Sequence, residues 1–130
     1  MALFFTLCDD ECMARTVLIV DDHPSFRATA RALLEADGFT VVGEARDGLE
    51  ALSLEEELHP EIVLLDVQLP DLTGFEVAAR LLERNGDAPS IVLVSSRDAA
   101  DYGGLIAECG ARGFVPKGEL TGAAVRALVG

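Results

Sequence analysis

The sequence is poor in aromatic residues and in positive charge. Its 130 residues include six Phe, one Tyr and no Trp, and ten Lys+Arg stand against 23 Asp+Glu, which gives a net charge of −13. Affinity for nucleic acids comes mainly from cations on phosphates, and single-strand binding also uses aromatic stacking. We therefore expect no direct nucleic-acid binding. The same negative charge argues against an anionic membrane surface as a partner.

Cysteine and long apolar runs are also scarce. Cys8, Cys12 and Cys109 are too few for a disulfide framework and lie at no zinc-site spacing, which favours reduced thiols in a cytoplasmic protein. The longest apolar stretch, residues 1–7, is far shorter than the roughly 20 residues of a membrane span. A secretory signal would need a Lys or Arg before this stretch, and none is present. We expect no membrane partner.

Residues 1–14 differ in pattern from the rest of the chain. Their apolar start and the acidic run Asp9-Asp10-Glu11 form neither a helical nor a strand repeat. We predict that residues 1–14 are an N-terminal extension or a mis-assigned start. One domain then occupies residues 15–130, and half of the whole chain is hydrophobic, which suits a buried core.

From residue 16 onward, short aliphatic runs alternate with helical patterns. Runs rich in β-branched residues predict five buried parallel strands, at 16–20, 40–42, 62–65, 91–94 and 113–115. The helical patterns carry their own start and stop signals: Ser25 to Gly38, Asp47 to Pro60, a third ending at Asn85-Gly86, a weak fourth over 99–109 and a fifth from about 119 to 128. This alternation predicts an α/β fold whose doubly wound parallel sheet is covered by helices on both faces.

Polar side chains follow four of the predicted strands. Asp21 and Asp22 come after the first, Asp66 after the third, Ser95 after the fourth and Lys117 after the fifth. In open α/β sheets, chemistry sits beyond the carboxyl ends of the strands, so these residues are expected at one edge. Carboxylates brought close raise one another's pKa, and a hard divalent cation relieves that cost. Mg²⁺ is the natural candidate, and Mn²⁺ is possible.

Lys117 is the only lysine among the ten cationic residues. A compact ammonium on a flexible stem suits a point contact with a carboxylate or phosphate oxygen, where a guanidinium fork would be bulkier. Its place at a strand end therefore indicates a specific role.

Four segments in order carry a resemblance to a known family. Residues 17–22 (VLIVDD), 64–66 (LLD), 93–96 (LVSS) and 113–117 (GFVPK) together resemble the receiver domain of bacterial two-component response regulators. The resemblance covers about residues 15–129. The segments DDHP and VGEA, which begin at Asp21 and Val42, look like the subgroup usually fused to a LuxR-type helix-turn-helix output domain. The resemblance implies a flavodoxin-like (βα)5 sheet with strand order 2-1-3-4-5.

The resemblance also implies the chemistry of the site. Asp66 would accept a phosphoryl group from a histidine kinase or a phosphotransfer protein. Asp22 and Asp66 would bind Mg²⁺ directly, Asp21 would act through water, and the backbone carbonyl of Gln68 would complete the protein ligands. Ser95, in place of the family's more usual Thr, would stabilise the phosphoryl group together with Lys117.

Further roles follow from the same resemblance. Ser95 and Phe114 would form a switch that changes partner binding or self-association, including a possible homodimer, through the face of the fourth helix, fifth strand and fifth helix. Gln68 and Arg97 would border the phosphate and tune its lifetime. Arg97 alternatively is a solvated surface residue, and Phe114 a core aromatic. The chain is then a signalling protein that assists its own phosphotransfer and dephosphorylation, not an enzyme.

Three other functions stay open at this stage. A phosphatase of the haloacid-dehalogenase type also uses an Asp after a strand with Mg²⁺, but it requires a second Asp where this chain has Gln68. The chain could be the receiver half of a DNA-binding transcription regulator whose output domain is absent here. A degenerate receiver that only binds a partner is the third, although all key pocket positions are filled.

Two other groups of polar residues have structural interpretations. His23 lies beside the expected pocket, at the mouth of the first helix, and we interpret it as structural. The run Glu55-Glu56-Glu57 is interpreted as a solvated helix face.

Overall fold

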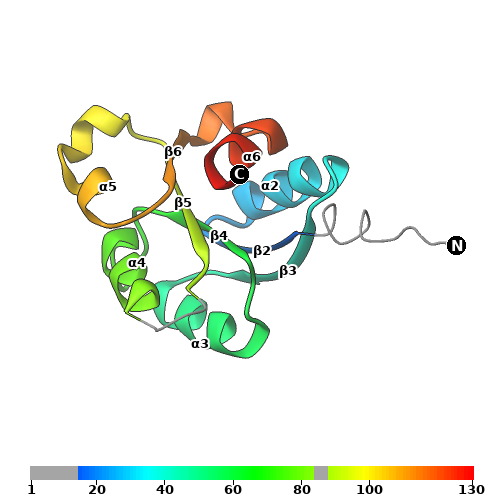
Figure 1. Ribbon diagram of the computed structural model, residues 1–130, viewed down its shortest axis with the longest axis horizontal. Coiled ribbons are helices and arrows are strands. Elements are labelled where there is room, and N and C mark those ends of the chain that lie inside the picture. Colours follow the sequence, from blue (N-terminus) through cyan, green and yellow to red (C-terminus); the bar gives the residue numbers. More distant parts are fainter. Residues whose placement is uncertain (1–14, 84–87) are drawn as a thin grey trace, which may run out of the picture.

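The computed structural model describes residues 15–83 and 88–130. The predicted extension over residues 1–14 and the predicted helix end at Asn85-Gly86 lie outside these residues. The described part contains one five-stranded sheet (Figure 1), made of β2 Thr16–Val20, β3 Thr40–Ala45, β4 Ile62–Asp66, β5 Ser90–Ser95 and β6 Gly113–Pro116. All pairings are parallel, and the order β3-β2-β4-β5-β6 is 2-1-3-4-5 along the chain. The predicted doubly wound, flavodoxin-like fold is confirmed.

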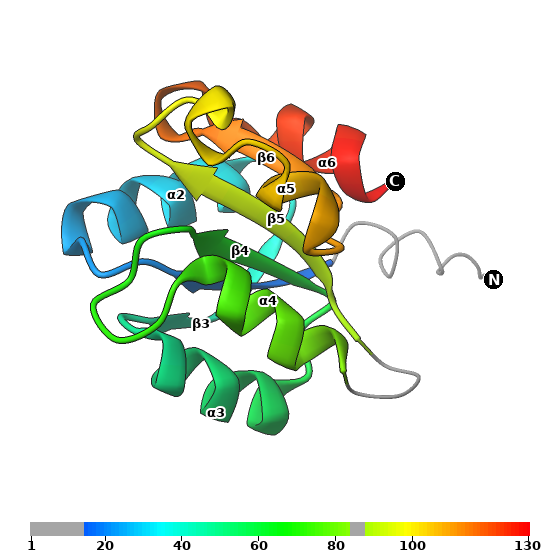
Figure 2. The same cartoon turned by 90° about the vertical axis from the view of Figure 1, so that its left-hand side faces the viewer.

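Helices cover both faces of the sheet (Figures 1 and 2). One face packs against α2 and α6, and the other against α3, α4 and α5. Their bounds are α2 Pro24–Ala36, α3 Gly48–Leu58, α4 Gly74–Leu82, α5 Leu105–Glu108 and α6 Gly122–Val129, with 3-10 turns η1 at Ala99–Tyr102 and η2 at Lys117–Glu119.

The central strands are buried from both sides. In β2, Val17 and Ile19 join the core on the α2 and α6 face, whereas Leu18 and Val20 join the core on the opposite face. All four are fully buried. Because alternate side chains of a strand point to opposite faces, a strand covered on both sides must be apolar at every position. This explains the uninterrupted aliphatic runs.

Two predicted helix starts are wrong. The first helix begins at Pro24, and neither His23, its N-cap residue, nor Ser25 caps it with a side-chain hydrogen bond. Proline suits the first helical position because its φ is fixed and it has no N–H to satisfy there. The last helix begins at Gly122 rather than near residue 119, with the Thr121 hydroxyl accepting the N–H of Ala124 at 3.0 Å.

Glu55 contradicts the interpretation of residues 55–57 as a solvated helix face. Its neighbours Glu56 and Glu57 are exposed, but Glu55 is buried. It lies four residues after Ala51, which is also buried. Since residues four apart share one side of a helix, Glu55 belongs to the inward side of α3.

The fourth helical segment is short and interrupted, as the glycine pair predicts. The 3-10 turn η1 ends at Tyr102 and α5 begins at Leu105, with Gly103 at φ 58° between them. Positive φ is readily adopted by glycine, which ends the turn here. None of the helices in the described ranges combines the length and hydropathy needed to cross a bilayer.

Candidate functional site

Strand register brings two aspartates together at the carboxyl edge of the sheet. Strands β2 and β4 pair Val20 with Leu65. The next residues, Asp21 and Asp66, therefore end at the same level on adjacent strands. Both side chains are buried, and Asp21 is fully so. Two buried carboxylates at one edge need cations or hydrogen-bond donors to offset their lost hydration.

Lys117, at the end of β6, supplies one such cation. Its Nζ lies 2.7 Å from Asp21 Oδ2 and 3.2 Å from Asp66 Oδ2, and 4.7 Å from the centre of the Phe26 ring. Burial alone lowers the pKa of Lys117, but the hydrogen bonds and charges of the two aspartates outweigh it and raise the pKa overall. Lys117 is therefore held as an ammonium between the carboxylates.

Asp66 holds a proton more firmly than an ordinary aspartate does. Burial raises its pKa first, the Gln68 N–H that it accepts at 3.1 Å lowers it, the nearby Asp21 charge raises it and Lys117 lowers it. The net result is a pKa raised to about 6. Asp66 is still largely ionised near pH 7, so it is available as a nucleophile.

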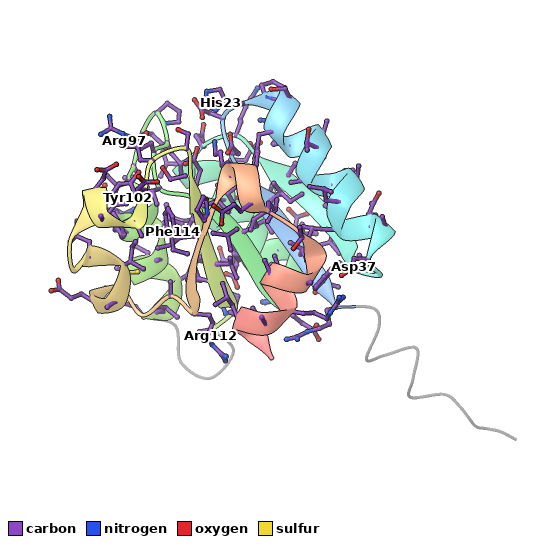
Figure 3. All side chains as sticks on the ribbon, turned by 90° about the horizontal axis from the view of Figure 1, so that it is seen from above. His23, Asp37, Arg97, Tyr102, Arg112 and Phe114 are labelled. Carbon is purple, nitrogen blue, oxygen red and sulfur yellow. The ribbon has the colours of Figure 1, made fainter. Side chains whose placement is uncertain are left out.

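His23 joins the two consecutive aspartates that follow β2. Its Nδ1 lies 3.1 Å from both Asp21 Oδ1 and Asp22 Oδ1, and its backbone N–H donates to Asp21 Oδ1 at 2.8 Å. Figure 3 shows His23 at the edge of the molecule, at the start of α2. The residue orders the acidic loop in addition to serving as the N-cap residue of α2.

The acidic cluster fits a divalent metal ion. Ligand atoms of Asp21, Asp22, His23 and Asp66 lie within 4.8 Å of one another. When ionised, the three carboxylates carry one charge each, and Lys117 offsets only one of the three. Carboxylate oxygens are the ligands that Mg²⁺ prefers. The donor set and the surplus of negative charge around buried Asp66 therefore both suit Mg²⁺.

Ser95 is the last residue of β5, one position beyond Val94, which pairs with Asp66 of β4. Its side chain is buried, and its Oγ accepts the N–H of Arg97 at 3.0 Å and lies 2.6 Å from the hydroxyl of Tyr102. The Arg97 side chain is exposed at the surface (Figure 3). Phe114 is partly buried against the core, with its ring centre 6.0 Å from that of Tyr102.

Two contacts of the site were not anticipated from the sequence. Arg27 of α2 donates from Nη1 to the backbone carbonyl of Asp21 at 2.7 Å, and from Nε to Glu44 at 3.0 Å. Tyr102 reaches Ser95. Both contacts span only a few residues of the chain, but no motif of a single sequence marks either residue, because each contact depends on the direction of a side chain. Gln68 contacts Asp66 through its N–H, and the metal-binding role of its carbonyl stays a prediction.

Comparison with known proteins identifies the family. The family model of the response regulator receiver domain matches residues 17–127. A putative transcriptional regulator of Pseudomonas aeruginosa is 44% identical over 103 residues, covering 79% of this chain and 49% of that protein. The virulence factors putative positive transcription regulator BvgA of Bordetella pertussis is 37% identical over 107 residues, covering 82% of this chain and 51% of BvgA. The chain thus spans about half the length of these curated relatives.

Solved structures agree with this assignment. A LuxR-family two-component response regulator from Aurantimonas sp. SI85-9A1 has a TM-score of 0.80 at 32% identity, with 89% of this chain and 85% of that chain covered. The receiver domain of the putative response regulator NarL from Mycobacterium tuberculosis has a TM-score of 0.80 at 31% identity, with 90% and 98% covered. Fold, acidic edge and family model agree, and the chain belongs to the response regulator receiver domain family.

Proposed function

We propose that Asp66 is the phosphoacceptor of this receiver and that a histidine kinase or phosphotransfer protein is the donor. The observation that carries the proposal is the position of Asp66: it is buried beside two further aspartates and its Oδ2 lies 3.2 Å from the ammonium of Lys117. A carboxylate so placed has a cation at hand for the charge of an incoming phosphoryl group.

The transfer requires little covalent work from the protein. An Asp66 oxygen attacks the phosphorus of a phosphohistidine, the new O–P bond forms, and the N–P bond breaks with its electron pair leaving on the imidazole nitrogen. The product is an acyl phosphate, as in enzymes with an aspartyl-phosphate intermediate. Positioning and charge neutralisation dominate catalysis of such a step. Lys117 and Ser95 are proposed to hold the phosphoryl oxygens.

The same proposal assigns the metal ligands. Asp22 and Asp66 bind Mg²⁺ directly, Asp21 acts through water and the carbonyl of Gln68 completes the protein ligands. When bound, the ion supplies positive charge that offsets the charge of the phosphoryl oxygens. Arg97 and Gln68, each two residues beyond a site residue, are proposed to influence how fast the acyl phosphate hydrolyses.

Labelling of Asp66 tests the proposed function. We expect the protein to incorporate phosphate from acetyl phosphate in the presence of Mg²⁺ and to incorporate little when EDTA is added first. The Asp66→Asn variant should incorporate none. The label should be released by hydroxylamine, which cleaves acyl phosphates. An Asp66→Asn protein labelled to the same extent as wild type would contradict the assignment.

A second candidate describes the longer protein to which such a receiver can belong. The curated relatives matched here are transcription regulators, and this chain spans about half their length. We propose that phosphorylation of Asp66 controls a DNA-binding output. The phosphatase alternative gains nothing from the structure: the residue two beyond Asp66 is Gln68, which contacts the nucleophile only through its backbone N–H.

A further inference from the structure

A tyrosine contacts the hydroxyl that the proposed function assigns to the phosphoryl group. The Oη of Tyr102, in the 3-10 turn η1, lies 2.6 Å from Ser95 Oγ at the end of β5. This distance lies within the usual range for hydrogen bonds between hydroxyl groups. The contact joins the carboxyl edge of the sheet, where Ser95 ends β5, to the 3-10 turn that carries Tyr102.

The surroundings of Ser95 indicate which hydroxyl donates. A serine hydroxyl has one proton and two lone pairs. One lone pair accepts the N–H of Arg97 at 3.0 Å. Because Ser95 is only 1% exposed, its proton needs an acceptor within the protein, and in the described ranges the acceptor it reaches is Tyr102 Oη. Tyr102 is only partly buried, so its own proton can go to water.

We propose that Tyr102 is a positioning residue that competes with the phosphoryl group for the single proton of Ser95. The inference rests on the proposed function, in which Ser95 donates to a phosphoryl oxygen. That proton cannot be given to Tyr102 at the same time. Phosphorylation of Asp66 therefore requires the Ser95–Tyr102 hydrogen bond, in its present direction, to break.

The ring of Tyr102 links this event to other elements. Its centre lies 5.6 Å from the ring of Phe75 in α4, edge to face, and 6.0 Å from that of Phe114 in β6. Phe114 has no hydroxyl, so Tyr102 supplies the phenol that Ser95 contacts. Loss of the bond leaves Tyr102 with its packing contacts, and we expect η1, which carries it, to respond.

Beryllofluoride, a noncovalent phosphoryl mimic, tests the competition at equilibrium. Its Kd is measured in saturating Mg²⁺ by fluorine NMR or calorimetry. Tyr102→Phe removes only the competing oxygen and keeps the ring. Since a typical hydrogen bond contributes roughly 0.5–1.5 kcal/mol net, we expect the variant to bind beryllofluoride about threefold to tenfold more tightly than wild type. Unchanged or weaker binding overturns the inference.

A double-mutant cycle shows whether Tyr102 acts through Ser95. Ser95→Ala should bind beryllofluoride more weakly than wild type, and adding Tyr102→Phe should change its Kd no further. A tightening that persists without the Ser95 hydroxyl would reflect a general change in structure and overturns the inference. If Tyr102 and Ser95 did not interact, the effects of the two substitutions on the Kd would instead add.

Tyr102 also provides its own spectroscopic signal, because the chain contains no Trp and no other Tyr. Beryllofluoride with Mg²⁺ should change tyrosine fluorescence in wild type but not in Ser95→Ala.

The experiments distinguish failure of the proposed function from failure of the inference about Tyr102. If wild type binds no beryllofluoride and Asp66 takes no label, the proposed function fails and this inference falls with it. If wild type binds and Tyr102→Phe binds equally, only the role of Tyr102 is lost.

Discussion

Asp66 carries an electrostatic cost that depends on pH. Its pKa is raised from an ordinary 3.8 to about 6, first by burial. Between these values the folded chain keeps a proton on Asp66 that the unfolded chain releases. The contribution of this group to stability is therefore full below about pH 4, and it is lost as the pH rises through about 6. An ionised Asp66 therefore lowers the stability of the fold at neutral pH.

We predict that Asp66→Asn stabilises the metal-free protein at neutral pH but not in acid. The gain should be up to roughly 3 kcal/mol at pH 7 and should vanish near pH 4, since one pKa unit corresponds to about 1.4 kcal/mol and the pKa is raised from 3.8 to about 6. Urea unfolding in EDTA at several pH values measures it. Glu57→Gln, which removes one charge from the exposed surface of α3, is the matched control. A gain that is constant with pH would contradict the prediction.

Single residues at strand ends could be anticipated from the sequence because their chemistry and position coincide. Asp21, Asp66 and Lys117 each follow an aliphatic run, and parallel strands deliver such residues to one edge. Tyr102 and Arg27 could not be anticipated in this way. Tyr102 reaches the site through its hydrogen bond with Ser95, and Arg27 through its bond to the Asp21 carbonyl; both bonds depend on side-chain direction, which no motif encodes.

At the scale of elements, α4 is packed against the backbone that carries Asp66. A Cβ added to Gly74, the first residue of α4, would lie 2.5 Å from the carbonyl oxygen of Asp66 and 2.8 Å from the Cα of Val67. The N–H of Gly74 donates to Val67 O at 2.7 Å. The absence of a side chain at Gly74 therefore lets the helix start directly beneath the site.

We predict that Gly74→Ala destabilises the protein by about 2–3 kcal/mol, because backbone atoms must move to admit the methyl group. The same shift displaces Asp66, so labelling by acetyl phosphate should also slow. Both are measured on the purified variant, by urea unfolding and by phosphate incorporation. Gly118→Ala is the control: nothing lies within 4 Å of its added Cβ and its φ is not positive. An equal loss in both variants would show that the site is not specifically involved.

Element boundaries were less predictable than element types. Asp47 was expected to open the second helix, and its side chain does accept the N–H of Glu50 at 2.8 Å. The start of the last helix was not predictable, because the helical pattern of the sequence extends back to about residue 119. In the structure, Lys117 reaches the aspartates, the 3-10 turn η2 follows, and α6 begins only after Thr121. Tertiary contacts of one residue thus override a local pattern.

At the scale of the whole molecule, the alternation of strands and helices predicts a parallel sheet covered on both faces, whereas the strand order is implied only by the family resemblance. Periodicity shows which segments are buried on both sides, but several strand orders satisfy the same pattern. The burial of Glu55 shows a further limit. A run of three glutamates reads as a solvated surface, yet the helical period places the first beside Ala51 on the inward side of α3.

The net charge of −13 makes metal binding and simple screening hard to separate, since any cation weakens repulsion among surface carboxylates. We predict that Mg²⁺ at ten times its Kd raises the Tm by roughly 5 °C, because binding to the folded state then contributes about 1.4 kcal/mol. NaCl at the same ionic strength should raise it much less.

Two variants with the same change in net charge locate the effect. Asp22→Asn should lose most of the Mg²⁺-specific increase in Tm while keeping the response to NaCl, and Glu57→Gln should keep both. If the two salts act alike on wild type, the cations respond to the overall charge and not to the cluster of Asp21, Asp22 and Asp66. If Mg²⁺ raises the Tm of Glu57→Gln more than that of Asp22→Asn, while NaCl affects both equally, the position of the removed charge governs the change in Tm, and the total charge does not. A cation site at the edge of the sheet requires this result.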